Sequence, residues 1–205
     1  MSAAVPSLAE RVFAQFLQLE HQARAAKNID SLAYALANDG QGLFGYRHAA
    51  LLIAGKVRAL TGVSVVEPNA PFVAFVEHAA RQLLAQGRSA QAQVIHAESL
   101  DKQSLADWQS LSAAAVFWLP LLDKQQQPFG GLWIARDQPW TDAEHVLLAH
   151  LGDAYSHAWL ALQPGKPWRL RWPRKKIIGA LLAALLLLLL IVRMLKQRQQ
   201  EHKAD

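Results

Sequence analysis

The chain has 205 residues, of which 52% are hydrophobic and 18% are charged, so it is too apolar for a disordered protein and too poor in charge for a coiled coil. It contains no cysteine, which excludes disulfides, zinc–thiolate sites, iron–sulfur clusters and thiol nucleophiles. The excess basic charge lies after residue 165, because residues 1–165 carry 11 basic and 14 acidic side chains, and we therefore expect no nucleic-acid partner.

The first predicted element is an amphipathic helix that makes up the N-terminal segment, residues 1–27. Its apolar residues recur at steps of three and four, and Pro6 and Ser7 suit the start of a helix. This helix either packs on the rest of the chain or pairs with a second copy in a homodimer, and the first alternative is preferred. A second helix is predicted up to Ala37, with Asn28 or Asp30 as its cap.

A hairpin, a helix and a short strand are predicted next. Two strand-like runs, residues 47–54 and 57–66, are separated by Gly55-Lys56, which is typical of a β-hairpin. Apolar residues at helical spacing predict a helix over residues 72–86. Residues 91–97 are expected to form a short strand.

The next part of the chain contains the sharpest local patterns. Residues 100–112 are polar, and we expect a loop with one helical turn. Apolar runs with β-branched and aromatic members predict strands over residues 113–122 and 129–135. Thr141 and Glu144 have the spacing of a capping box and predict the start of a long helix. The order of elements predicts an α+β fold with an antiparallel sheet flanked by helices.

Three segments, residues 115–123 (AVFWLPLLD), 128–134 (PFGGLWI) and 141–144 (TDAE), resemble the closing half of a GAF domain in their order and spacing. The resemblance covers about residues 28–162 and implies a GAF-like domain over residues 28–163. It also implies a sensory module, frequently dimeric, with a small-molecule pocket on one face of the sheet. The absence of cysteine excludes the family's methionine-sulfoxide reductase chemistry and its bilin attachment, so the ligand stays open.

Candidate pocket residues are aromatic, although aromatic residues in strands belong more often to a core. Gly130 and Gly131 are expected to allow a close backbone approach or a bulge. The eight histidines lack metal-ligand spacing, and the sequence contains neither a G-x-S-x-G elbow nor a glycine-rich phosphate loop. We therefore expect no catalytic residue, metal or cofactor; the alternatives are an enzyme with an unrecognised site and a purely structural anchor. The pocket candidates are Phe44, Tyr46, Trp118 and Trp133.

Residues 177–195 are predicted to form a transmembrane helix, preceded by a basic linker (164–176) and followed by a short polar tail (196–205). Nineteen helical residues span roughly 28 Å, close to the ~30 Å hydrocarbon core of a bilayer. Basic residues are more numerous before the span than after it, so we expect a single-pass protein of the bacterial inner membrane with a cytoplasmic GAF-like domain. The basic residues that flank the span are Arg169, Arg171, Arg174, Lys175, Lys176 and Arg193.

A GAF-like domain followed by a basic stretch and one span resembles the N-terminal part of bacterial HlyD-type membrane-fusion proteins, which are periplasmic adaptors. This resemblance implies secretion or efflux components as partners. The sequence stops at Asp205, so we expect either a truncated adaptor or a self-contained anchored module. In both cases the GAF-like domain would act by binding a ligand or a protein, without catalysis.

Overall fold

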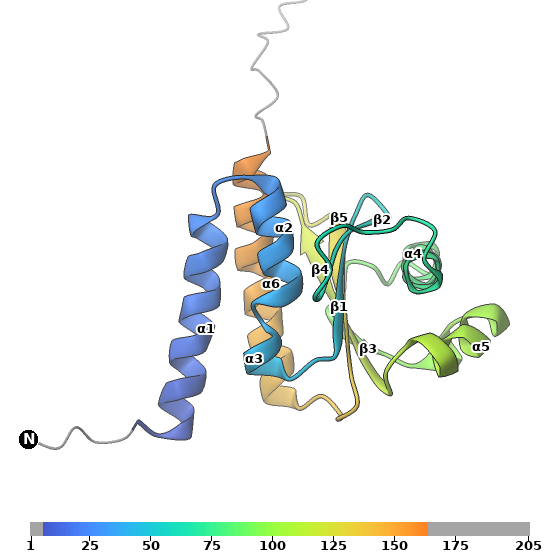
Figure 1. The fold of residues 1–205 in the computed structure, drawn as a ribbon, viewed down its shortest axis with the longest axis horizontal. Helices are drawn as coiled ribbons and strands as arrows, with labels where there is room; N and C mark the ends of the chain where they lie inside the picture. The colour runs from blue at the N-terminus through green and yellow to red at the C-terminus, as the bar shows by residue number, and fades with distance from the viewer. Residues whose placement is uncertain (1–5, 164–205) are drawn as a thin grey trace, which may run out of the picture. The chain divides into compact units, whose positions relative to one another are not determined.

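A five-stranded antiparallel sheet with helices on both faces forms the described part of the chain (Figure 1). The computed structural model describes residues 6–163. Within this range no helix combines the length and the apolarity needed to cross a membrane. The predicted linker, span and tail, residues 164–205, lie outside the described residues.

The sheet has the strand order β2-β1-β5-β4-β3, and every neighbouring pair is antiparallel. The three strands in the middle are buried on both faces over most of their length, which explains their nearly continuous apolar sequences. The strands are β1 (His48–Ile53), β2 (Lys56–Leu60), β3 (Gln93–Ile95), β4 (Ala115–Leu122) and β5 (Pro128–Arg136).

The predicted hairpin is present, but its turn and its second strand differ from the expectation. The turn is Ala54-Gly55, one residue earlier than expected, and both residues have positive φ, as a tight two-residue hairpin turn requires. Strand β2 ends at Leu60 instead of residue 66. The reason is that Gly62, with a φ of 72°, turns the chain so that Val63 bonds back to Leu60.

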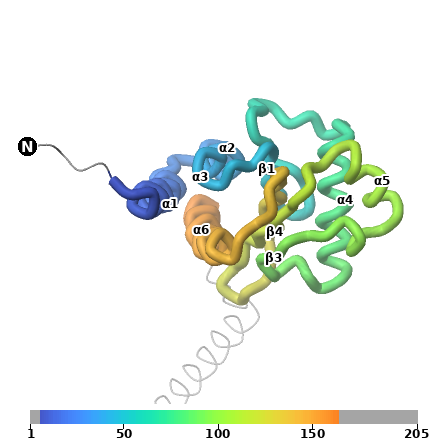
Figure 2. Tube along the Cα trace, turned by 90° about the horizontal axis from the view of Figure 1, so that it is seen from below, coloured from blue at the N-terminus to red at the C-terminus, as the bar shows by residue number. Residues whose placement is uncertain are grey.

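One face of the sheet is covered by α2, α3 and α6, and α1 packs on the outside of α6 and α2 (Figure 2). Ser7, Asn28 and Thr141 each begin a helix with a reciprocal capping box, which confirms the box predicted at Thr141. The short α3 was not predicted. The helices of this layer are α1 (Leu8–Ala25), α2 (Ile29–Asn38), α3 (Gln41–Phe44) and α6 (Asp142–Leu162).

The opposite face is covered by α4 (Pro71–Ala85), and α5 (Lys102–Leu111) packs on α4. The prediction of a loop over residues 100–112 is wrong, because α5 occupies most of it. Asp101 caps this helix by accepting a hydrogen bond from the Ser104 N–H at 2.8 Å. Only two residues of α5 are buried, which gives the sequence too weak an apolar periodicity to reveal a helix.

Candidate functional site

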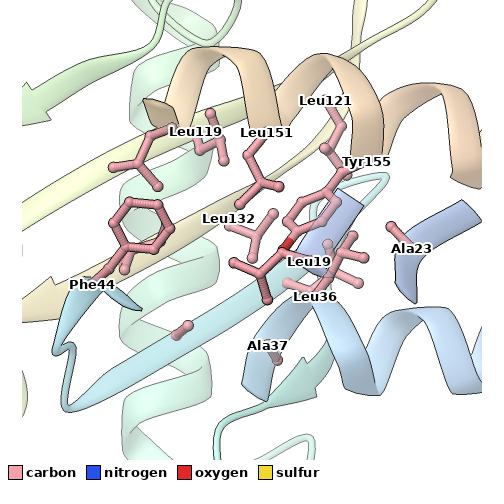
Figure 3. Packing of buried hydrophobic residues seen from close by; sticks show 14 of the residues in the cluster. Leu19, Ala23, Leu36, Ala37, Phe44, Leu119, Leu121, Leu132, Leu151 and Tyr155 are labelled. Atoms are coloured by element: carbon pink, nitrogen blue, oxygen red, sulfur yellow. The ribbon is translucent and has the colours of Figure 1, made fainter. Parts of the chain in front are cut away.

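The four predicted pocket residues are all buried, but the sheet separates them into two pairs. Phe44 and Tyr46 belong to the core between the sheet and α1, α2 and α6. Figure 3 shows Phe44 among leucines of this core, together with Tyr155 from α6. Trp118 and Trp133 lie on the other face, beneath α4 and α5. The four residues therefore do not line a single cavity.

Tyr46 holds the start of the sheet against α2. Its hydroxyl donates a hydrogen bond to the carbonyl oxygen of Ala37 at 3.1 Å. Burial raises the pKa of Tyr46 well above its usual range, and the nearby charge of Asp39 raises it further. The hydroxyl thus stays protonated and serves as a donor, which gives Tyr46 a packing role.

Trp133 occupies the middle of the α4-side core. It lies directly opposite Trp118 across β4 and β5. Its ring packs edge to face on Phe75 and Trp108, at centroid distances of 5.7 and 5.6 Å. Its indole nitrogen is buried and has no hydrogen-bond partner in the described part of the chain. These aromatic rings fill the space between the middle of the sheet and the helices.

Trp118 lies against the backbone of β5, and Gly131 makes this position available. A Cβ atom on Gly131 would come within 2.6 Å of Cη2 of the Trp118 ring, so no larger residue fits without displacing it. The Trp118 indole N–H donates to the carbonyl oxygen of Ser89 at 2.9 Å, which fixes the ring. The register also shifts at Leu121/Leu122, opposite Phe129. The expected close backbone approach at the two glycines is confirmed, and the irregularity in β5 lies next to them, at Phe129.

A cavity of about 140 Å³ opens beside Trp118, between α4, the β1–β2 turn and the start of β5. Ala80 faces it from α4, and its small side chain leaves the space that a larger residue would fill. The lining is mainly apolar, with Arg81 and the buried Ser89 as its polar members. The apolar lining side chains include Leu52, Leu84, Trp118, Pro128 and Phe129.

Helix α4, which borders this cavity, carries the charged side chains of Glu77 and Arg81 one turn apart. Glu77 accepts hydrogen bonds from Lys56 Nζ at 2.6 Å and from the Val57 N–H at 3.1 Å, which ties the hairpin to α4. Burial opposes ionisation, but these two donors, together with the nearby positive charges of Lys56 and Arg81, hold the pKa of Glu77 below its ordinary value. Arg81 donates from Nε to the Glu77 carbonyl and forms no ion pair within 4 Å among residues 6–163. The rim of the cavity is therefore cationic.

Of the four predicted pocket residues, Trp118 lines this cavity, and its neighbours Ala80 and Arg81 were not predicted. The apolar periodicity of α4 predicted a helix without showing which of its residues would leave a gap against the sheet. The histidines do not assemble a site, since no group of three His, Asp or Glu side chains in the described residues is placed to hold a metal ion.

No protein-family model matches the sequence, and no curated protein matches it. Solved structures do match. Residues 122 to 287 of a methyl-accepting chemotaxis protein are 14% identical, with a TM-score of 0.52, over 73% of this chain and 98% of that one. The phytochrome photosensory core module of Stigmatella aurantiaca is 16% identical, with a TM-score of 0.54, over 89% of this chain and 42% of that one.

A third similar structure is the GAF domain of the cyanobacteriochrome TePixJ, which is 14% identical, with a TM-score of 0.50, over 68% of this chain and 94% of that one. At such identities the likeness establishes the fold, which is GAF-like. The chain spans about two fifths of the length of the phytochrome module. The predicted α+β architecture and its GAF-like character are thereby confirmed for residues 6–163.

Proposed function

We propose that the chain is a membrane-anchored sensory or protein-interaction module, without catalytic activity, whose GAF-like domain binds a small ligand beside Trp118. The observation that carries this proposal is the apolar cavity on the α4 face of the sheet. The similar structures support it, because they come from a chemotaxis protein and from a photosensory core module.

The size and charge of the cavity indicate the ligand class. A dry apolar cavity of about 150 Å³ in another protein holds benzene, so about 140 Å³ suits a single aromatic ring. Arg81 supplies a guanidinium group at the rim, and no acidic residue within 6–163 lines the cavity. A small aromatic or branched-chain carboxylate combines the apolar body and the anionic end that these residues require.

Thermal unfolding of the purified full-length chain in a non-ionic detergent tests this assignment, with benzoate as the probe and benzamide as its neutral analogue. If the Kd is about 1 mM, 10 mM benzoate stabilises the fold by about 1.4 kcal/mol. This corresponds to a rise in Tm of about 3–6 °C for a protein of this size. Benzamide should produce a smaller shift, because it lacks the charge that Arg81 recognises.

Ala80→Leu fills the cavity and should abolish the benzoate shift. Ala74→Leu is the matched control, because Ala74 is an exposed alanine of the same helix that does not line the cavity. An unchanged benzoate shift in Ala80→Leu, or equal shifts with benzamide, would contradict the proposed site. Turnover of a bound compound would favour the alternative of an enzyme. The absence of a shift with any ligand would favour the structural anchor.

The membrane anchor rests on the sequence of residues 177–195, and its orientation on the distribution of the flanking basic residues. Because the chain has no cysteine, single cysteines report topology directly. In intact cells, a membrane-impermeant maleimide should label Gln199→Cys but not Ser110→Cys, and both should react after lysis. Labelling of Ser110→Cys in intact cells would reverse the orientation. The homodimer and the partnership with secretion or efflux components stay predictions.

A further inference from the structure

Ser89 lines the cavity beside Trp118 from the turn between α4 and β3. The residue is more than 90% buried. Its carbonyl oxygen accepts the Trp118 indole N–H, but its hydroxyl forms no hydrogen bond with any residue in the range 6–163. Buried polar groups in proteins are nearly always hydrogen-bonded, so an unpartnered hydroxyl in the wall of a mainly apolar cavity points to a ligand group that completes it.

The hydroxyl oxygen of Ser89 is open to the cavity. Within the described residues, some unpartnered polar side-chain atoms are sealed from solvent, such as those of Ser112 and Trp133, and the Ser89 oxygen is not one of them. The oxygen therefore keeps accessible surface, and the cavity is the space that Ser89 borders. A hydroxyl both donates and accepts hydrogen bonds, so both capacities are available to an occupant.

The turn that carries Ser89 is fixed before any ligand binds. The Arg88 N–H donates to the Leu83 carbonyl oxygen at 2.8 Å, which closes the end of α4. Gln93, at the start of β3, donates from Nε2 to the Arg88 carbonyl oxygen at 2.8 Å and accepts from Arg88 Nε at 3.0 Å. The 2.9 Å bond from Trp118 to the Ser89 carbonyl oxygen adds a tie to β4. Binding therefore requires little ordering of this wall beyond rotation of the hydroxyl.

Ser89 and Arg81 together define what the cavity can recognise. In the described part of the chain they carry the free polar side-chain groups of the lining, because the Trp118 N–H is already engaged. Arg81 is exposed at the rim, whereas Ser89 is buried. A ligand thus meets a cation at the opening and a neutral hydroxyl in an otherwise apolar wall.

We propose that Ser89 determines the specificity of this cavity and selects aromatic carboxylates that carry a hydroxyl group on the ring. This inference rests on the ligand site proposed above and adds the substituent that the site selects. The ligand hydroxyl exchanges a hydrogen bond with Ser89, while its carboxylate pairs with Arg81. A ligand with a methyl group at the same ring position removes water from the Ser89 hydroxyl and gives it no partner, so it binds more weakly.

Ligand-observed NMR titration of the purified full-length chain in the non-ionic detergent tests this selection. The probes are 3- and 4-hydroxybenzoate, and the control for each is the methylbenzoate of the same ring position, which matches it in shape and charge. For the isomer whose hydroxyl reaches Ser89, we expect a Kd about three- to tenfold lower than that of its methyl counterpart. Binding of both hydroxybenzoates no tighter than that of their methyl counterparts would overturn the proposal.

Ser89→Ala assigns the preference to this residue. It should weaken the hydroxybenzoate and reduce the preference to less than about twofold, without weakening the methylbenzoate. Ser64→Ala, which changes an exposed serine outside the cavity, should keep the preference. An undiminished preference in Ser89→Ala would place the ligand hydroxyl elsewhere and refute the role of Ser89. Because the preference is measured first in the wild type, a poorly folded variant would not remove the test.

Unsubstituted benzoate separates this inference from the ligand site on which it rests. Benzoate binding that Ala80→Leu abolishes, together with equal affinities for the hydroxybenzoates and methylbenzoates, would keep the site and overturn the role of Ser89. If no benzoate binds at all, the site itself is wrong, and the selection by Ser89 fails with it.

Discussion

Replacing Glu144 by glutamine should destabilise the fold by about 3 kcal/mol, because Glu144 is the counter-ion of a buried arginine. The Arg136 side chain is 9% exposed and uses every one of its N–H groups. Nη1 and Nη2 each donate to a Glu144 carboxylate oxygen at 2.6 Å. The remaining N–H groups donate to the carbonyl oxygens of Phe44, Gln138 and Pro139 at 2.6–2.9 Å. The arginine thus joins α3, the end of β5 and the start of α6.

The size of the expected loss of stability follows from the lowered pKa of Glu144. The hydrogen bonds from Arg136, and to a lesser extent those from Thr141, lower the pKa of Glu144 from 4.5 to about 2, although partial burial acts in the opposite direction. A shift of that size corresponds to about 3 kcal/mol in favour of the ionised folded state. Because the folded-state pKa is the lower one, this stabilisation is complete above pH 4.5 and is lost as the pH falls towards 2.

Thermal unfolding followed by tryptophan fluorescence measures the effect on the full-length chain in detergent. At pH 7 the Tm of Glu144→Gln should lie about 6–12 °C below that of the wild type. Asp142→Asn removes the same charge from the same helix terminus without touching Arg136, so it should cost only a small helix-dipole contribution. At pH 3 the gap between Glu144→Gln and the wild type should fall to less than half.

Two results would refute this reasoning. The first is a Glu144→Gln variant as stable as Asp142→Asn at pH 7, which would make the ion pair worth no more than a surface charge. The second is a gap from the wild type that stays constant between pH 7 and pH 3, which would mean that the lost stability does not come from the ionised carboxylate.

Two further substitutions test the packing of the sheet. Gly131→Ala should lower stability by about 1–3 kcal/mol and change the near-UV circular dichroism, because its Cβ displaces the Trp118 ring; Gly42→Ala, which meets open space, should do neither. Ser156→Ala should cost about 1–3 kcal/mol, because the Leu122 N–H loses its acceptor at 2.9 Å. Faster hydrogen exchange at the Leu122 amide would locate that loss, and unchanged exchange would contradict it.

Features that depend on short-range patterns were predictable from the sequence. The capping box at Thr141, the strands on either side of residues 123–127 and the close approach at Gly131 all follow from residues near one another in the chain. Helix α5 was not predicted, because it depends on contacts with residues that are distant in the sequence. Its position depends on Trp108 packing against Phe75 and on Asp101 meeting His78 at 2.8 Å, and both partners lie on α4.

The sequence also could not show on which face of the sheet each predicted pocket residue lies. Strand alternation assigns side chains to one face or the other only when one face is polar, and β4 and β5 are buried on both faces. Trp118 and Trp133 share a face because β4 and β5 pair with these residues opposite each other, and that register is a property of two strands together. Phe44 precedes the sheet at the end of α3, where no strand period applies.

Glu144 has both a local and a long-range role. Its role at the start of α6 was predictable because Thr141 lies three residues before it, and the structure confirms that role. Its partner Arg136 lies eight residues earlier, at the end of a strand, and no helical or strand period relates the two positions. The same carboxylate therefore begins a helix and neutralises a buried cation. Of the two roles, the neutralisation requires the assembled fold, and it is the one expected to cost more stability when it is lost.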